Sequence, residues 1–162
     1  MREAFGGSWL LGFVALFIVL FFAFLAVSIN YTKAFQAKNK IINIIEQNEG
    51  MSKSVGDVRN KTDEELNKGK TTEDKIYYYL KQAGFVIDKE TVSGRCPDDT
   101  DDTTLYAGGY CVKGISTREG KYYKVTTFVK IELPLLWQSF TVPITGETKT
   151  IYYDYSDVDC GW

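Results

Sequence analysis

The sequence predicts an α+β fold in which one long N-terminal helix, first transmembrane and then amphipathic, packs on a small antiparallel β-sheet meander. Three features of the 162 residues predict this arrangement. An uncharged run is followed by apolar residues at helical spacing, and the second half is rich in tyrosine and valine with alternating polarity. We expect a short tail at residues 1–8, a transmembrane helix at 9–29, an amphipathic helix extension at 30–49, a polar loop at 50–72 and an exported α+β domain at 73–162.

The uncharged run reads WLLGFVALFIVLFFAFLAVSI and matches the thickness of a lipid bilayer. At about 1.5 Å of rise per residue it spans about 31 Å, close to a hydrocarbon core of about 30 Å. Trp9 and Tyr31 flank it, where aromatic rings prefer the membrane interface. A cleaved signal peptide and a buried core helix are the alternatives, although the run exceeds the apolar core of about 7–15 residues usual for a signal.

The helix is expected to continue past the bilayer, because neither proline nor glycine interrupts the chain until Gly50. Apolar residues recur there at helical spacing and form one broad stripe. The stripe can pack on the protein's own sheet, contact neighbouring subunits, or do both. We take four of its residues as the candidate assembly surface: Phe35, Ile41, Ile42 and Ile45.

A polar segment and a short helix follow. Residues 50–72 contain few apolar side chains and are expected to form a loop with at most a frayed helical turn. Thr71 and Thr72 then precede a helix with acidic residues in its first turn and Gly84 as its C-cap. Its apolar face should cover the sheet.

The remainder predicts a four-stranded antiparallel meander with one face covered by helix. Gly108 and Gly109 suggest a bend or bulge within one strand. Two connections, Arg118–Gly120 and Thr145–Glu147, are short enough for hairpins. The candidate strands are 85–87, 105–115, 121–133, 139–144 and 149–155.

Composition argues against several classes of function. The chain has no histidine, the commonest general base and metal ligand, and shows no nucleophile beside a base and no glycine loop that would cradle phosphate. The formal charge of −2 argues against nucleic-acid binding. We therefore expect a protein that is not an enzyme, with no catalytic residue and no cofactor.

Cysteines and acidic residues are the remaining candidates for a site. Cys96 and Cys111 are disulfide candidates, with Cys160 left over, and the alternative is that all three are reduced. A zinc site is disfavoured because there is neither histidine nor a C-x-x-C pair. A run of carboxylates is either a weak calcium site or a solvated turn: Asp98, Asp99, Asp101 and Asp102.

Two features of the sequence predict opposite directions of membrane insertion. Lys33, Lys38 and Lys40 precede the first acidic residue after the apolar run, which favours a cytoplasmic C-terminal domain. The cysteines and the tyrosine-rich β region favour an oxidising exterior. We predict a single-pass protein of the cell membrane with its N-terminus in the cytoplasm and its C-terminal domain outside.

The overall plan resembles type IV pilin-like proteins and is most similar to TadE-like minor pilins and pseudopilins of tight-adherence pilus systems. Besides the apolar helix, two stretches carry the resemblance: NYTKAFQAKNKIINIIEQNEG and YYKVTTFVKIELPLLWQSFTVPITGETKTIYY. The resemblance implies a non-enzymatic subunit that waits in the bilayer and contacts other pilin-like or secretion-apparatus subunits through its N-terminal helix. The alternatives are a component of a conjugation or secretion complex that enters no filament, and a membrane-anchored extracellular binding module.

Overall fold

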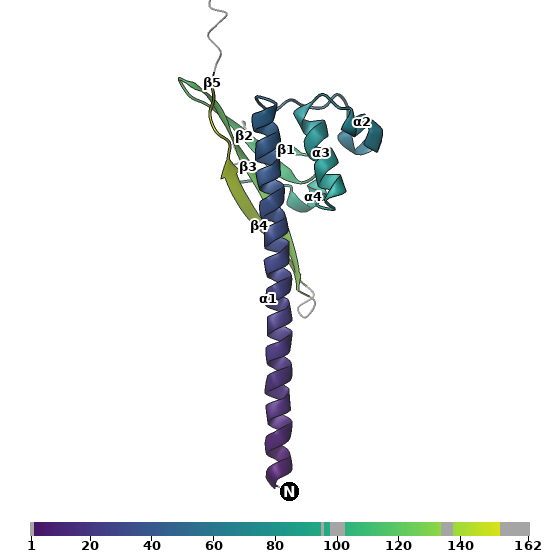
Figure 1. The fold of residues 1–162 in the computed structure, drawn as a ribbon, viewed down its shortest axis with the longest axis vertical. Coiled ribbons are helices and arrows are strands. Elements are labelled where there is room, and N and C mark those ends of the chain that lie inside the picture. The colour runs from purple at the N-terminus through teal and green to yellow at the C-terminus, as the bar shows by residue number, and fades with distance from the viewer. Residues whose placement is uncertain (1, 95, 98–102, 134–137, 153–162) are drawn as a thin grey trace, which may run out of the picture.

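A computed structural model describes residues 2–94, 96–97, 103–133 and 138–152. It confirms the α+β class, because one very long helix packs on a small antiparallel sheet (Figure 1). The elements are α1 Arg2–Gln47, the 3₁₀ helix η1 Val58–Asn60, α2 Asp63–Asn67, α3 Thr72–Gln82, α4 Lys89–Val92, β1 Thr103–Tyr106, β2 Tyr110–Ser116, β3 Gly120–Leu133, β4 Gln138–Glu147 and β5 Ile151–Tyr152.

Helix α1 is continuous over 46 residues and therefore about 69 Å long. It already begins at Arg2, so residues 2–8 are helical and do not form the separate tail expected from the sequence. At its other end Gly50 N–H donates to Ile45 O at 3.0 Å and Glu49 N–H to Glu46 O at 3.2 Å, the two bonds of a Schellman motif. Glu49 takes the left-handed position of that motif, with φ of 53°.

The sheet has the order β1-β2-β3-β4, with all neighbours antiparallel. The short β5 pairs with the start of β3, beyond the end of β4 and along the same edge. The predicted hairpin at Thr145–Glu147 is therefore wrong, because these residues pair with β3 inside β4. The turn at Arg118–Gly120 is confirmed, since it joins β2 to β3.

Two further strand predictions are corrected. The single strand expected at 105–115 is a hairpin, in which Gly108 and Gly109 adopt φ of 104° and 76° in the turn between β1 and β2. Residues 85–87 form no strand and instead follow α3 as a connection, held by a bond from Ile87 N–H to Gly108 O at 3.3 Å.

The polar segment 50–72 is more ordered than its composition predicts. Thr62 and Glu65 form a capping box at the start of α2, which satisfies backbone donors that would otherwise be free. Val58 and Leu66 are buried against Tyr77 of α3, so these two apolar side chains help to hold the segment against α3.

The C-terminal third of α1 contributes to the main core between helix and sheet. Ile41 and Ile45 lie there with Ile76 of α3 and with Tyr123 and Val125 of β3. These five side chains are buried, so burial of apolar surface holds the helix on the sheet.

Helix α1 also approaches strand β4 closely. A Cβ on Gly146 would lie 2.9 Å from both Ile42 Cδ1 and Lys38 Cδ. Glycine at this position therefore lets the helix lie flat against β4.

Candidate functional site

The N-terminal part of α1 is bare. Between Trp9 and Ile29 every residue is exposed except Ala23 and Val27, which are partly covered. The helix is long and apolar enough to cross a membrane, with a mean hydropathy of 3.1 over its most apolar window and none of that window buried in the protein. An apolar surface of this extent marks a region that lipid or another protein covers.

A shallow groove lies on one side of this bare segment. Gly12 leaves a shallow groove of about 270 Å³ between Trp9, Phe13 and Leu16. The rings of Trp9 and Phe13 meet edge to face with their centroids 4.8 Å apart, and no atom lies within 4 Å of a Cβ placed on Gly12. This groove has room for an acyl chain or for a side chain of a neighbouring helix.

The four candidate assembly residues fall into different environments. Ile41 and Ile45 are 0% exposed in the core, so their assignment to an assembly surface is wrong: the protein's own sheet covers that face of α1. Ile42 is half-buried against the same core. Phe35 remains 43% exposed, with Lys38 Nζ 4.3 Å from its ring centroid.

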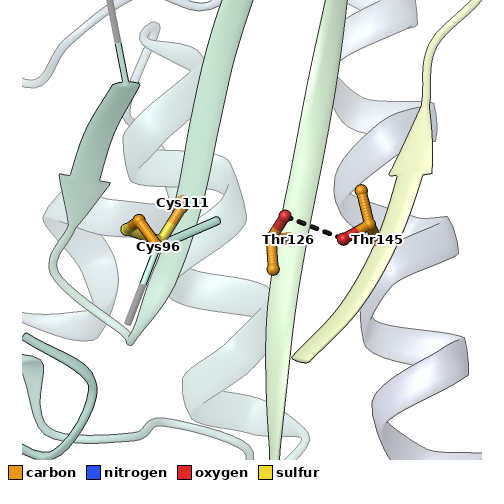
Figure 2. Close-up of a disulfide and its surroundings, with 4 residues drawn as sticks. All are labelled: Cys96, Cys111, Thr126 and Thr145. Atoms are coloured by element: carbon orange, nitrogen blue, oxygen red, sulfur yellow. Dashed lines mark hydrogen bonds between the residues drawn. A yellow bond between two sulfur atoms is a disulfide. The ribbon is translucent and has the colours of Figure 1, made fainter. Parts of the chain in front are cut away.

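Cys96 and Cys111 form a disulfide, as the sequence suggested, with their Cα atoms 6.0 Å apart (Figure 2). Strand alternation places Cys111 on the sheet face opposite α1, where it is buried with Val92 and Phe128. Beside it, the hydroxyls of Thr126 and Thr145 lie 3.1 Å apart across β3 and β4. The disulfide thus fastens the α4 region to the outer face of the sheet.

The proposed calcium ligands and Cys160 lie outside the described residues. Asp98, Asp99, Asp101 and Asp102 all belong to the undescribed stretch. Within the part of the chain that the structure describes, no group of three or more His, Cys, Asp or Glu residues could hold a metal ion.

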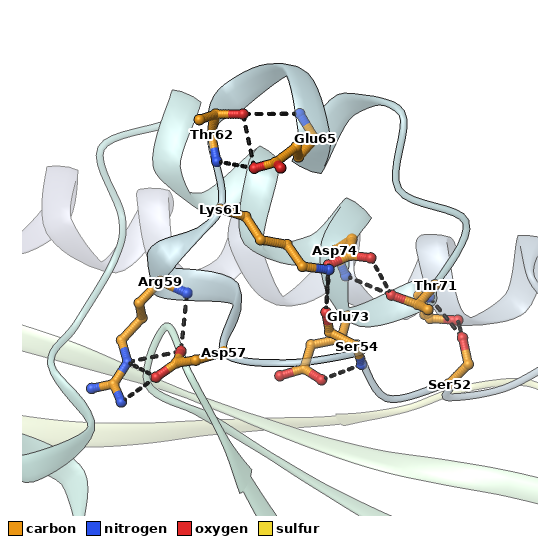
Figure 3. Close-up of polar contacts among 11 residues, drawn as sticks. Ser52, Ser54, Asp57, Arg59, Lys61, Thr62, Glu65, Thr71, Glu73 and Asp74 are labelled. Carbon is orange, nitrogen blue, oxygen red and sulfur yellow. Dashed lines mark hydrogen bonds and ion pairs between the residues drawn. The ribbon is translucent and has the colours of Figure 1, made fainter.

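A polar network that was not predicted from the sequence is centred on Asp74 (Figure 3). Its carboxylate accepts hydrogen bonds from Lys61 Nζ at 2.8 Å, Ser54 Oγ at 2.7 Å and Thr71 Oγ1 at 2.6 Å. Burial raises the pKa of Asp74, but these donors outweigh burial and hold the pKa below its ordinary value. The network pins the polar segment to α3, and the only signal for it was the capping pattern of Thr71 and Asp74.

Two stacked tyrosines lie at the β1–β2 hairpin. The rings of Tyr106 and Tyr110 are parallel within 8° and 5.3 Å apart. Burial raises the pKa of Tyr106 to about 12 and the pKa of Tyr110 well above its ordinary value, and the charge of Glu73 acts in the same direction. Both phenols are therefore neutral at physiological pH and act as packing groups.

Comparisons with known protein families, with characterised proteins and with solved structures gave no match. The candidate site therefore rests on the geometry of this chain alone. Among the described residues, the exposed large apolar side chains are concentrated on the bare N-terminal part of α1, and Tyr31 and Phe35 continue this surface beyond it.

Proposed function

We propose that this protein is a non-enzymatic, single-pass membrane subunit of the pilin-like kind, which joins neighbouring subunits in a surface filament or a secretion apparatus. One observation carries the proposal: a single unbroken helix has its C-terminal part buried by the protein's own sheet and its N-terminal part bare. The fold needs no contact with the bare part, so that part is available for lipid before assembly and for other helices afterwards.

The shape of the molecule supports the same function. The domain lies along the upper part of α1, while the lower part projects alone (Figure 1). Because the helix is continuous through Asn30 and Tyr31, no loop separates the domain from the membrane segment. In such a subunit, the contacts that the membrane segment makes also orient the domain.

The disulfide supports an exterior location for the domain. Disulfides persist in oxidising compartments and are rare in the cytosol. The Cys96–Cys111 bond therefore outweighs the three lysines at the start of the extension, whose count favours the opposite orientation. In the proposed orientation the N-terminus faces the cytoplasm.

Site-directed photocrosslinking in intact cells tests the proposal. A photoreactive residue at Phe17, which is 71% exposed in the bare segment, should form adducts with a second copy or with another membrane subunit. The same residue at Lys53, on the exposed polar segment, serves as the control and should form far fewer. Adducts with lipid alone at Phe17 and at other bare positions, in protein correctly inserted in the membrane, would contradict assembly through α1.

Mechanical shearing of the cells separates the two kinds of assembly. Crosslinked protein in the sheared surface material indicates a filament subunit. Crosslinked protein that stays entirely with the membrane indicates a secretion or conjugation complex without a filament.

A Phe35→Ser and Ile41→Ser pair separates assembly from folding. Phe35 is exposed and Ile41 is fully buried. We expect the Phe35 variant to keep a folded domain with weaker crosslinking, and the Ile41 variant to lose domain stability. Equal loss of folding in both variants would mean that Phe35 serves the fold and not assembly.

A further inference from the structure

A groove of about 180 Å³ lies between α1 and α3, close to where the apolar segment ends. Lys33, Gln36 and Ala37 of α1 form one wall. Tyr79, Ala83 and Phe85, at the C-terminal part of α3 and just beyond it, form the other. The lining of the groove thus combines apolar side chains with one cationic and one amide side chain.

The direction of α3 places this groove on the membrane side of the domain. Lys75, near the start of α3, donates a hydrogen bond to Asn48 just past the end of α1. The end of α3 instead lies across the groove from Lys33 and Ala37 of α1. Helix α3 therefore runs back along α1, so that its C-terminal end lies nearer the bare part of α1 than its start does (Figure 1). With α1 inserted in the bilayer up to Ile29, this end of α3 faces the lipid headgroups.

The height of Lys33 above the bilayer core matches the headgroup layer. Lys33 follows Ile29 by four residues, or about 6 Å along the helix. The headgroup region adds about 5–7 Å to each side of the hydrocarbon core. Exposed apolar side chains lie at the same end of the domain, including Phe35 on α1 and Val86 after α3.

The charge of the groove is unbalanced. The extension carries lysines at 33, 38 and 40, and no acidic residue appears before Glu46. Among the described residues, Lys33 and Lys40 form no ion pair, and Lys40 Nζ lies 5.8 Å from the centroid of the Tyr79 ring. A ligand that complements this site carries a negative charge and an apolar body.

We propose that the groove between α1 and α3 binds the phosphate headgroup of an anionic phospholipid, with Lys33 as its cationic contact. The apolar lining residues Ala37, Ala83 and Phe85 accommodate the upper part of the lipid. The bound lipid fixes how the domain sits on the bilayer. This inference rests on the membrane anchoring of α1, but it does not depend on assembly with other subunits.

Native mass spectrometry of the full chain in detergent, with equal amounts of phosphatidylglycerol and phosphatidylcholine, tests the site. The wild type should retain phosphatidylglycerol in preference to phosphatidylcholine. Lys33→Gln should lower that preference about fivefold, the effect expected for one lysine near an anionic headgroup. Ala83→Leu, which fills the groove without changing charge, should lower retention of phosphatidylglycerol as well.

Lys68→Gln is the matched control, because Lys68 is exposed on the polar segment after α2. The control should bind lipid as the wild type does. The proposal is overturned if Lys33→Gln keeps the wild-type preference, or if Lys68→Gln loses it equally through loss of diffuse charge. Displacement of phosphatidylglycerol by inorganic phosphate at equal concentration would show a phosphate site and overturn the lipid assignment.

Vesicle flotation distinguishes the absence of the lipid site from the absence of the membrane anchor. A protein that floats with phosphatidylcholine vesicles but shows no preference for phosphatidylglycerol retains its anchor and lacks the lipid site. A protein that fails to float with any vesicle lacks the anchor itself.

Discussion

Removal of the disulfide gives the sharpest test of how the domain is held together. The perturbation is the double variant Cys96→Ala and Cys111→Ala. The bond joins residues 15 positions apart, and the chain-entropy model assigns such a loop about 3 kcal/mol of stability. Cys111 also packs with Val92 and Phe128, so truncation to alanine costs about 1 kcal/mol more. We expect a loss of about 4 kcal/mol in the free energy of unfolding.

Denaturant unfolding of the full chain in detergent, followed by the near-ultraviolet signal of the aromatic residues, measures this loss. A reducing agent should weaken the wild type by about 3 kcal/mol and leave the double variant unchanged. A Cys160→Ala variant should respond to reductant as the wild type does, because it keeps the proposed pair. The reasoning is refuted if the double variant is as stable as the oxidised wild type, or if Cys160→Ala removes the response to reductant.

Three smaller changes test single contacts by the same unfolding assay. Asp74→Asn should cost about 2 kcal/mol at pH 7. Because the folded pKa of Asp74 lies below its unfolded value, its contribution is fully present above about pH 4 and is lost as the pH falls through the folded pKa. The wild type should therefore lose more stability than the variant in that acidic range. Glu49→Gly should stabilise by about 1 kcal/mol, since glycine adopts the left-handed conformation without strain; a decrease would contradict the helix ending described here. Thr127→Val should also gain about 1 kcal/mol, because the buried hydroxyl has no hydrogen-bond partner among the described residues, and a loss would mean that it has one.

Much of the helical structure could be predicted from the sequence because its signals are local. An uninterrupted run without proline predicted that α1 continues past the membrane. Thr71 accepts a hydrogen bond from Asp74 N–H at the start of α3, and Gly84 is left-handed after its end, as capping residues require. These features depend on residues within one helical turn of each other.

The wrong strand and hairpin predictions arose at glycines, because a glycine can indicate a turn, a bulge or a close approach of another element. Gly146 follows Thr145 as a turn glycine would, but its role is to let Lys38 and Ile42 lie against β4. Gly108 and Gly109 suggested a bulge within one strand, whereas the chain reverses there into a hairpin. The type of residue was informative in both cases, but the partner that explains it lies far away in the chain.

The candidate surface was harder to predict than the fold, because an apolar stripe does not say what covers it. Ile41 and Phe35 belong to the same amphipathic extension, yet one is fully buried and the other is exposed. The two residues are six positions apart, which places them on different sides of α1, and the sheet covers the side that carries Ile41. Helical periodicity separates the two sides, but strand pairing between residues distant in sequence determines which side the sheet covers.

The two parts of α1 show how one helix serves two surroundings. Between Trp9 and Ile29 the helix is apolar on all sides, a pattern that suits lipid or a ring of neighbouring helices. After Asn30 the apolar residues narrow to one stripe, and Ala34 is the first of them to be fully buried by the domain. The change in hydropathy and the change in burial therefore occur at the same place, although one is read from composition and the other from packing. Because the domain leaves the uniformly apolar part uncovered, that part is the surface on which the proposed assembly would depend.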